Sequence, residues 1–364
     1  MTLKLISVLF LFLCSTTIVM GEAEKTPVTV FMCADSGDHS GAPELSFIQG
    51  AMMNSRAVQI PFCQTAYFGE LVGKDGNIFS ALAITTGIGY ASATSCTVQL
   101  MRFSAYKPKS IVFLGTSGFS PFQGGFDPLH KESGCHPVRD AVPKNAIGSV
   151  CVTSGSFLME SGECIEDLAD NQCSRPMCSR FNKTTALNQI VANPLLSDAI
   201  RAANKDVKFP QMSSTVVDGL KKWWSSNEAA ENPNTPMEPR IVQCAESTYN
   251  SIFVGAQRDY LCREYTAQVM KLPISEVVCA QAMEGFGFLK AMVNFPDVPV
   301  AVIRSASNYD MYPLKWNVNG RWEQNLNYVS EKEYGTFLNA SFHYSVKTAS
   351  FVVANYFLNK TFEA

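Results

Sequence analysis

The sequence predicts an α/β protein whose mixed, largely parallel central sheet is flanked by helices on both faces. Two patterns support this fold class. Short apolar runs of strand length alternate with segments of helical spacing along most of the chain. These runs are continuously apolar and do not alternate with polar residues, which is typical of strands buried on both faces of a sheet.

The order of elements in the N-terminal third predicts a parallel crossover. An apolar strand from Val28 to Cys33 leads into a polar loop, and a second strand, Asn77–Thr85, is followed by the turn Gly87–Gly89. Helical spacing then runs from Ala91 to Ser104, and Ser110–Gly115 is again strand-like. A strand, a helix and a strand joined by short loops place both strands parallel in one sheet.

The same alternation recurs after a long middle segment. Strands are expected at Ala146–Thr153, Ile241–Cys244, Glu276–Ala280 and Val298–Arg304, and helices at Glu284–Val293 and Lys332–Leu358. The segment from about 154 to 240 is polar and bears cysteines, with helices expected at Ala186–Asn204 and Val216–Trp224. We interpret it as an irregular, cysteine-rich insertion within a single domain that spans residues 22–364.

The first 21 residues have the layout of a secretory signal peptide: one early lysine, an apolar run from Leu5 to Met20, and small residues before the expected cleavage point. The run is short for a membrane anchor. The mature chain is therefore expected outside the cell, or in an endomembrane or vacuolar lumen, without a membrane anchor. Three sequons, at Asn182, Asn339 and Asn359, predict N-glycosylation.

Cysteine usage agrees with an oxidising compartment. The chain has 12 cysteines, of which Cys14 lies in the predicted leader. The remaining odd number predicts disulfides together with a free or intermolecular thiol. No CxxC pair occurs, so we favour disulfides over a zinc site and expect neither a metal nor a cofactor. With a net charge of -3 and no basic cluster, nucleic acid is not an expected partner.

Polar residues follow three of the predicted strands, where open parallel sheets bind ligands. The first group is Gly115, Thr116, Ser117 and Gly118; the second is Met283 with Glu284; the third runs from Arg304 to Asn308. Each group also has a structural explanation. The first could be a tight turn after a strand, Glu284 in the second could cap a helix, and Asn308 in the third could be a turn residue. Arg304, within a buried strand, should have a carboxylate or carbonyl partner.

Taken in order, the motifs Thr86–Ala93, Gly115–Gly118, Met283–Glu284 and Ile303–Asn308 resemble the nucleoside phosphorylase–nucleosidase superfamily. That superfamily includes methylthioadenosine/S-adenosylhomocysteine nucleosidases, purine nucleoside phosphorylases, secreted plant storage proteins and fungal purine nucleoside permease-like proteins. The resemblance covers about residues 28–153 and 241–358. It implies a nucleoside phosphorylase-like fold, a purine nucleoside as ligand and a homo-oligomer.

The resemblance also implies residue roles. Glu284 would hold the ribose hydroxyls and act in catalysis, with Met283 against the sugar. Gly115, Thr116, Ser117 and Gly118 would line the pocket for phosphate or water. Tyr249 would contact the base, and Asn308 would bind it and assist its departure.

Two positions depart from the family pattern. Asn308 stands where the nucleosidases carry an aspartate that protonates the base, and an asparagine has no proton to give. Asp310 could replace that aspartate only if its loop turned inward. Phe113 stands where hexameric phosphorylases carry a phosphate-binding arginine, which favours water over phosphate as the acceptor. A base for that water could come from the first loop, which holds Asp35, Asp38, His39 and Glu44.

Three functions stay open at this point. The first is an enzyme that cleaves the N-glycosidic bond of a purine nucleoside and releases free base, by hydrolysis in preference to phosphorolysis. The second is a catalytically weak nucleoside-binding or storage protein with the same fold. The third is a nucleoside-uptake component. The retained Met283–Glu284 pair predicts nucleoside binding in all three.

Overall fold

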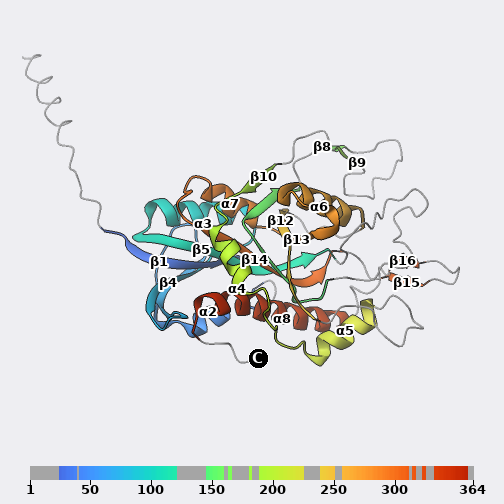
Figure 1. Cartoon of the computed structure of the whole chain (residues 1–364), viewed down its shortest axis with the longest axis horizontal. Helices are drawn as coiled ribbons and strands as arrows, with labels where there is room; N and C mark the ends of the chain where they lie inside the picture. The colour runs from blue at the N-terminus through green and yellow to red at the C-terminus, as the bar shows by residue number, and fades with distance from the viewer. Residues whose placement is uncertain are drawn as a thin grey trace, which may run out of the picture.

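The computed structural model describes residues 24–38, 41–120, 145–159, 163–165, 180–182, 188–224, 238–250, 256–310, 314–316, 322–324 and 332–359. Within these ranges the chain forms one large mixed sheet with helices on both faces (Figure 1). This confirms the predicted fold class. The predicted signal peptide, residues 1–21, lies outside the described residues, and the predicted domain boundaries stay a prediction.

The large sheet has twelve strands, and its main path runs β10-β7-β12-β13-β5-β1-β4-β3-β2. A branch starts at β5, where β14 pairs with β5, β6 pairs with β14, and β11 pairs with β6. The strands are β1 (Thr26–Cys33), β2 (Met53–Ala57), β3 (Thr65–Val72), β4 (Ile78–Thr85), β5 (Tyr106–Phe119), β6 (Val150–Thr153), β7 (Gly155–Leu158), β10 (Gln189–Val191), β11 (Ile241–Val242), β12 (Cys244–Thr248), β13 (Val278–Ala282) and β14 (Val300–Tyr309). Two small hairpins, β8 (Glu163–Ile165) with β9 (Arg180–Asn182) and β15 (Leu314–Trp316) with β16 (Trp322–Gln324), are separate from it.

The centre of the sheet is parallel and dry. β1 lies between β4 and β5 and pairs in parallel with both, and β14 pairs in parallel with β5. The strand–helix–strand unit β4–α3–β5 is the predicted crossover, with α3 at Tyr90–Phe103. Side chains such as those of Phe31, Val112 and Ile303 are fully buried. Continuous apolar runs suit these strands because helices cover both of their faces.

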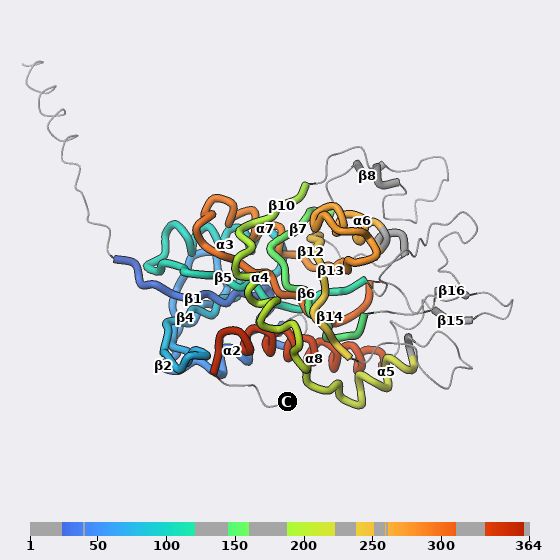
Figure 2. Tube along the Cα trace, viewed as in Figure 1, coloured from blue at the N-terminus to red at the C-terminus, as the bar shows by residue number. Residues whose placement is uncertain are grey.

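Two groups of helices cover the two faces. On one face, α3 and α7 (Gly285–Met292) pack against one apolar cluster. On the other, α2 (Ser46–Ala51), α4 (Leu195–Ala203) and the long α8 (Lys332–Phe357) pack against a second cluster. Figure 2 shows α8 running along the sheet with α2 beside it, so a helix from the N-terminal part of the chain packs against the C-terminal helix. α5 (Ser214–Trp224) also packs on α8, and α6 (Ala256–Met270) packs over β12 and β13.

Two local predictions were wrong. The expected loop at Gly115–Phe119 is strand, because β5 stays paired there with β14 on one side and with β13 on the other. The expected helix at Ala186–Asn204 begins only at Leu195. The strand β10 precedes it and pairs with β7, and Asn193 accepts a hydrogen bond from the Leu195 amide at the start of α4.

Three disulfides tie the described residues together: Cys63–Cys96, Cys151–Cys244 and Cys262–Cys279. Cys33 is a buried free thiol, and the cysteines at 135, 173 and 178 lie outside the described residues. Disulfides were predicted without pairing, and the second bridge joins β6 to β12. Within the described ranges, no group of three metal-ligating side chains occurs.

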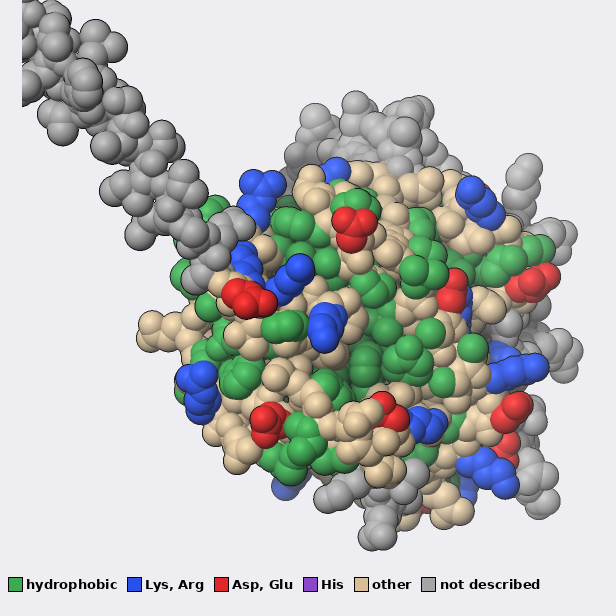
Figure 3. Space-filling model, turned by 60° about the vertical axis from the view of Figure 1, so that its left-hand side comes forward, with side chains coloured by type: hydrophobic (Ala, Val, Ile, Leu, Met, Phe, Trp, Pro, Cys, Tyr) green, Lys and Arg blue, Asp and Glu red, His purple; other side chains and the backbone are tan. Residues whose placement is uncertain are grey.

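The surface carries charges of both signs as scattered single residues on the face shown in Figure 3. Two of the predicted glycosylation sites, Asn339 on α8 and Asn359 just after it, are exposed. The side chain of the third, Asn182, is not among those described. Within the described residues no helix is both long and apolar enough to span a bilayer.

Candidate functional site

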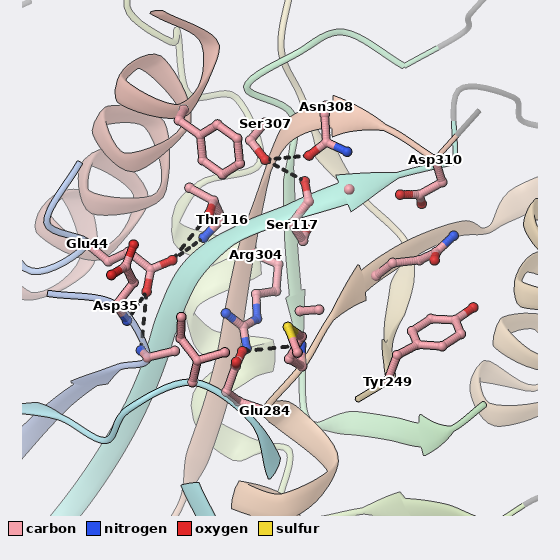
Figure 4. A pocket seen from close by; sticks show the side chains of 17 residues that line it. Asp35, Glu44, Thr116, Ser117, Tyr249, Glu284, Arg304, Ser307, Asn308 and Asp310 are labelled. Atoms are coloured by element: carbon pink, nitrogen blue, oxygen red, sulfur yellow. Dashed lines mark hydrogen bonds and ion pairs between the residues drawn. The ribbon is translucent and has the colours of Figure 1, made fainter. Parts of the chain in front are cut away.

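A cavity of about 150 Å³ opens where β5, β13 and β14 meet the loop after β1 (Figure 4). A single water needs roughly 10–15 Å³, so the space suits an organic ligand. Ile88, from the turn before α3, and Phe342 of α8 contribute apolar surface to its wall. The lining also includes five buried ionisable side chains, which is unusual for a protein interior: Asp35, Glu44, Glu284, Arg304 and Asp310.

The structure brings nearly all the predicted site residues to this cavity. Those that line it are Thr116, Ser117, Gly118, Tyr249, Met283, Glu284 and Asn308. Gly115 is not among the lining residues. A Cβ atom on Gly115 would lie 2.5 Å from both Arg304 Nη1 and Glu44 Oε1. Its lack of a side chain therefore makes room for the charged groups that form the cavity wall.

Arg304 is the centre of a buried ion-pair network. Its Nε donates to Glu246 Oε2 at 2.8 Å, and its Nη2 donates to Glu284 Oε2 at 2.9 Å. The guanidinium also lies over the ring of Phe113, 5.1 Å from the centroid. Arg304 was predicted to have a carboxylate or carbonyl partner, and it has two carboxylate partners. Buried charges persist only when they are paired in this way. Burial lowers the pKa of Arg304, but the carboxylates of Glu246 and Glu284 outweigh this effect and raise the pKa above its ordinary value.

Glu284 occupies the N-cap position of α7, as the sequence suggested it could. Its Oε1 accepts a hydrogen bond from the backbone of Gly89 at 3.0 Å. Gly89 has φ 96°, a conformation that favours glycine. Burial raises the pKa of Glu284, while the neighbouring Arg304 guanidinium opposes that rise. The carboxylate is held from two sides and still faces the cavity.

Glu44 lies on the opposite wall and accepts hydrogen bonds from backbone amides of the loop after β1 and of β5. Its Oε2 accepts from the amides of Ala34 and Asp35 at 3.2 and 3.1 Å. Its Oε1 accepts from the amide of Thr116 at 2.7 Å and lies 3.3 Å from the Thr116 hydroxyl. Burial raises the pKa of Glu44 to about 7, against the lowering effects of Arg304 and of the Thr116 amide.

The charges around the cavity are unequal. Glu44, Glu246 and Glu284 all interact electrostatically with the single guanidinium of Arg304. With the carboxylates ionised, the cluster is net negative. The Thr116 amide, expected to bind phosphate or water, already donates to a carboxylate. Such a wall repels a phosphate dianion and attracts a group that becomes positively charged.

The far end of the cavity holds a second polar group. Figure 4 shows Tyr249, Asn308 and Asp310 across the cavity from Glu44 and Asp35. Asn308 Oδ1 accepts from the Ser307 hydroxyl at 2.9 Å. β14 has a bulge between Ala306 and Asn308, and bulges re-aim side chains locally. Asp310, which follows, lines the cavity, so the inward turn that the sequence left open does occur.

Sequence reasoning missed two residues of this region. Glu246 was not considered, because the predicted strand ended at Cys244, whereas in the structure Glu246 lies inside the buried strand β12. A carboxylate inside a buried strand is itself a signal that a cationic partner exists. Gln281, on β13, was passed over as part of a strand–helix junction. It is only 8% exposed and lines the cavity.

No protein-family model and no curated protein sequence matches the chain. Among solved structures it is similar to the 5′-methylthioadenosine/S-adenosylhomocysteine nucleosidase of Neisseria meningitidis in complex with methylthio-immucillin-A, at 14% identity and TM-score 0.44, over 90% of this chain and 98% of that one. It is also similar to the Streptococcus pneumoniae nucleosidase in complex with 8-aminoadenine, at 12% identity and TM-score 0.47, over 90% and 98%. Futalosine hydrolase of Helicobacter pylori is similar at 13% identity and TM-score 0.45, over 90% and 97%.

Because these similarities are remote, the activity has to be argued from the residues of the chain itself. The plant storage and fungal permease-like proteins, to which the motifs also bear a resemblance, are not among these neighbours.

Proposed function

We propose that the chain binds a purine nucleoside in this cavity and hydrolyses its N-glycosidic bond. The observation that carries the proposal is the net-negative cluster of Glu44, Glu246 and Glu284 around Arg304. Glu44, Glu284 and Arg304 of this cluster line the cavity. Cleavage of a ribosyl–base bond develops positive charge on the sugar. A fixed carboxylate that faces that charge in a buried site stabilises the transition state more than the neutral ground state.

Glu284 is the residue that would bind the ribose. Its Oε1 accepts one hydrogen bond, from the Gly89 amide, and its Oε2 accepts two, from Arg304 and from the Met283 amide. An ionised carboxylate has about four lone-pair positions, so one position, on Oε1, remains for a ribose hydroxyl. Met283 lies beside it on the wall and offers a soft apolar surface to the sugar.

Glu44 is the residue that would activate water. A general base works best when its pKa lies near the operating pH, and that of Glu44 is about 7. Glu44 lies on the wall opposite Tyr249 and Asn308. This arrangement supports a pose in which the base of the nucleoside lies at one end of the cavity and the attacking water at the other. This order suits displacement of the base from the far side of the sugar.

Water is the acceptor that this wall favours. A phosphate dianion in place of the water would meet the Glu44 carboxylate on the Thr116 amide. Phe113 is buried under Arg304, and the guanidinium is engaged by Glu246 and Glu284. Phosphorolysis therefore lacks a free cationic partner among the described residues of the wall.

A second candidate function is nucleoside binding without turnover. It is favoured by Asn308, whose amide can hold a purine edge but cannot protonate it. We further propose, from the predicted leader, that either function acts on nucleosides outside the cytoplasm.

The deciding experiment incubates the purified chain with adenosine, inosine and methylthioadenosine, with and without phosphate. We expect equal release of free base in both conditions. We expect Glu284→Ala to abolish that release while the protein stays folded, as judged by its circular dichroism. Glu276→Ala is a matched control, since Glu276 is exposed on a short 3-10 turn away from the cavity. Phosphate-dependent release would instead identify a phosphorylase. Thermal stabilisation by nucleoside without release would identify a binding protein.

A further inference from the structure

Three polar atoms on the cavity wall have no hydrogen-bond partner in the described structure: Ser117 Oγ, Gln281 Nε2 and Asp310 Oδ2. Their residues are 5%, 8% and 3% exposed. A buried polar atom without a partner is destabilising by about 1–3 kcal/mol, and native proteins tolerate few of them. Three on one wall indicate a ligand that supplies the missing partners.

The position of Asp310 is built into the fold. Its carboxyl group lies over Gly118 of β5, and a Cβ atom on Gly118 would fall 1.9 Å from Asp310 Oδ1. The backbone amide of Asp310 donates to the carbonyl of Phe119 at 3.0 Å, which anchors the residue at the end of the β5–β14 pair. A side chain at position 118 would exclude the carboxyl group from the cavity.

We propose that Asp310 is the general acid of the reaction, and that it donates its proton to the leaving base while Gln281 and Ser117 hold that base. The inference rests on the proposed nucleosidase function and adds the proton donor that Asn308 cannot be. Asp310 lies at the end of the cavity where Tyr249 and Asn308 are, across from Glu44 (Figure 4).

The bond between the ribosyl anomeric carbon and the purine nitrogen breaks, and its electron pair leaves with the base. Asp310 gives its proton to a ring nitrogen of the base, which departs neutral. A water oxygen bonds to the anomeric carbon and its proton passes to the Glu44 carboxylate. Solvent then returns a proton to Asp310 and removes one from Glu44, so the enzyme is unchanged.

The charges around Asp310 favour its neutral form. Burial raises the pKa of Asp310 well above its ordinary value, and the nearby carboxylate of Asp259 on α6 raises it further. A side-chain contact with Gln281, too poor in geometry to count as a hydrogen bond, offsets this only in part. Asp259 itself is buried and paired with Arg263 on the same helix, at 3.1 Å. Arg304 makes its ion pairs with Glu246 and Glu284. Asp310 is thus favoured in its protonated form, which is the form that can donate a proton.

The test compares two leaving groups. One substrate is adenosine, inosine or guanosine, whichever the wild-type chain turns over; the other is the same nucleoside methylated at N7. Methylation gives the base a fixed positive charge, so it leaves without a proton. We expect Asp310→Asn to lower kcat/KM for the unmethylated nucleoside by about 10²–10⁴-fold and for the methylated one by less than tenfold.

The methylated substrate also reports on folding, because a misfolded variant would lose both activities. Asp35→Asn makes the same chemical change at the other end of the cavity, and any loss there should be equal for the two substrates. Equal losses in Asp310→Asn, or none, would overturn the role of Asp310 alone. A wild-type chain that turns over no nucleoside would instead overturn the proposed function, and this inference with it.

Discussion

The two acidic walls of the cavity differ in how their carboxylates are held. Glu284 forms an ion pair with the guanidinium of Arg304, whereas the hydrogen bonds described for Glu44 come from backbone amides and a threonine hydroxyl. Backbone amides orient a carboxylate without neutralising it. This difference suits Glu284 to a fixed negative charge beside the sugar and leaves Glu44 free to take up and release a proton near neutral pH.

Glu44 gives the activity a defined pH dependence. The base is the ionised carboxylate, which exists above its pKa, so kcat/KM should rise as the pH increases through about 7. A free glutamate, with a pKa of about 4.3, would place that rise far lower. We expect Glu44→Gln to lower kcat/KM by about 10²–10⁴-fold and to remove the rise, measured as initial rates of base release from pH 5 to 9. A rise that persists unchanged in Glu44→Gln would assign it to another group.

For single residues, the sequence predicted which side chains line the cavity but did not predict their hydrogen-bond partners. The motifs located Glu284, Thr116 and Asn308, and all three line one cavity. The partner of Thr116 could not be predicted, because Glu44 lies 72 residues away and meets it only through the sheet. No spacing in the sequence encodes that contact.

At the scale of elements, the close approach of β5 and β14 depends on glycine. Arg304 and Gly115 are register partners on these strands, and the guanidinium reaches Glu246 on β12 and Glu284 before α7. The space above Gly115 is filled by Arg304 Nη1 and Glu44 Oε1. A strand that carried a side chain there would separate the two charged groups.

Gly115→Ala should therefore destabilise the fold and the site together. Its new methyl group would meet atoms 2.5 Å away on both Arg304 and Glu44, and overpacking of this kind lowers the free energy of unfolding by about 1–3 kcal/mol. Urea denaturation measures the change. Gly335→Ala on α8 is the matched control: nothing lies within 4 Å of the added Cβ, and alanine stabilises a helix by roughly 0.5–1 kcal/mol relative to glycine. A Gly115→Ala variant as stable as the wild type would contradict the packing described.

The strands that the sequence predicted are those with uninterrupted apolar runs, such as β1, β4 and β14. The strands it missed pair at the margins of the sheet. β2 is exposed along its whole length, and β3 alternates between buried and partly exposed positions, so neither has the continuous apolar character that was sought. β10 is three residues long and depends on β7 for its pairing. Tertiary pairing, which local composition does not reveal, decides such strands.

At the scale of the whole molecule, the sheet gathers charges from distant parts of the chain. Glu44 comes from the first loop, Glu246 from β12, Glu284 from the start of α7 and Arg304 from β14. The resulting cluster has three acids for one guanidinium. The resemblance of a few motifs located this convergence in outline, but the surplus of negative charge emerges only when the elements are assembled.

That surplus predicts an order of affinities. A ribose mimic with a cationic ring nitrogen should bind at least a hundredfold more tightly than the neutral nucleoside, because it has the charge that the transition state develops. A hundredfold difference in Kd corresponds to about 2.7 kcal/mol. Phosphate should give no stabilisation. Thermal shifts at equal ligand concentrations measure the order, since a ligand that binds only the folded state raises the unfolding temperature according to its affinity. Equal binding of the cationic mimic and of its uncharged carbon analogue would show that the buried carboxylates do not act on the sugar, whatever the cavity binds.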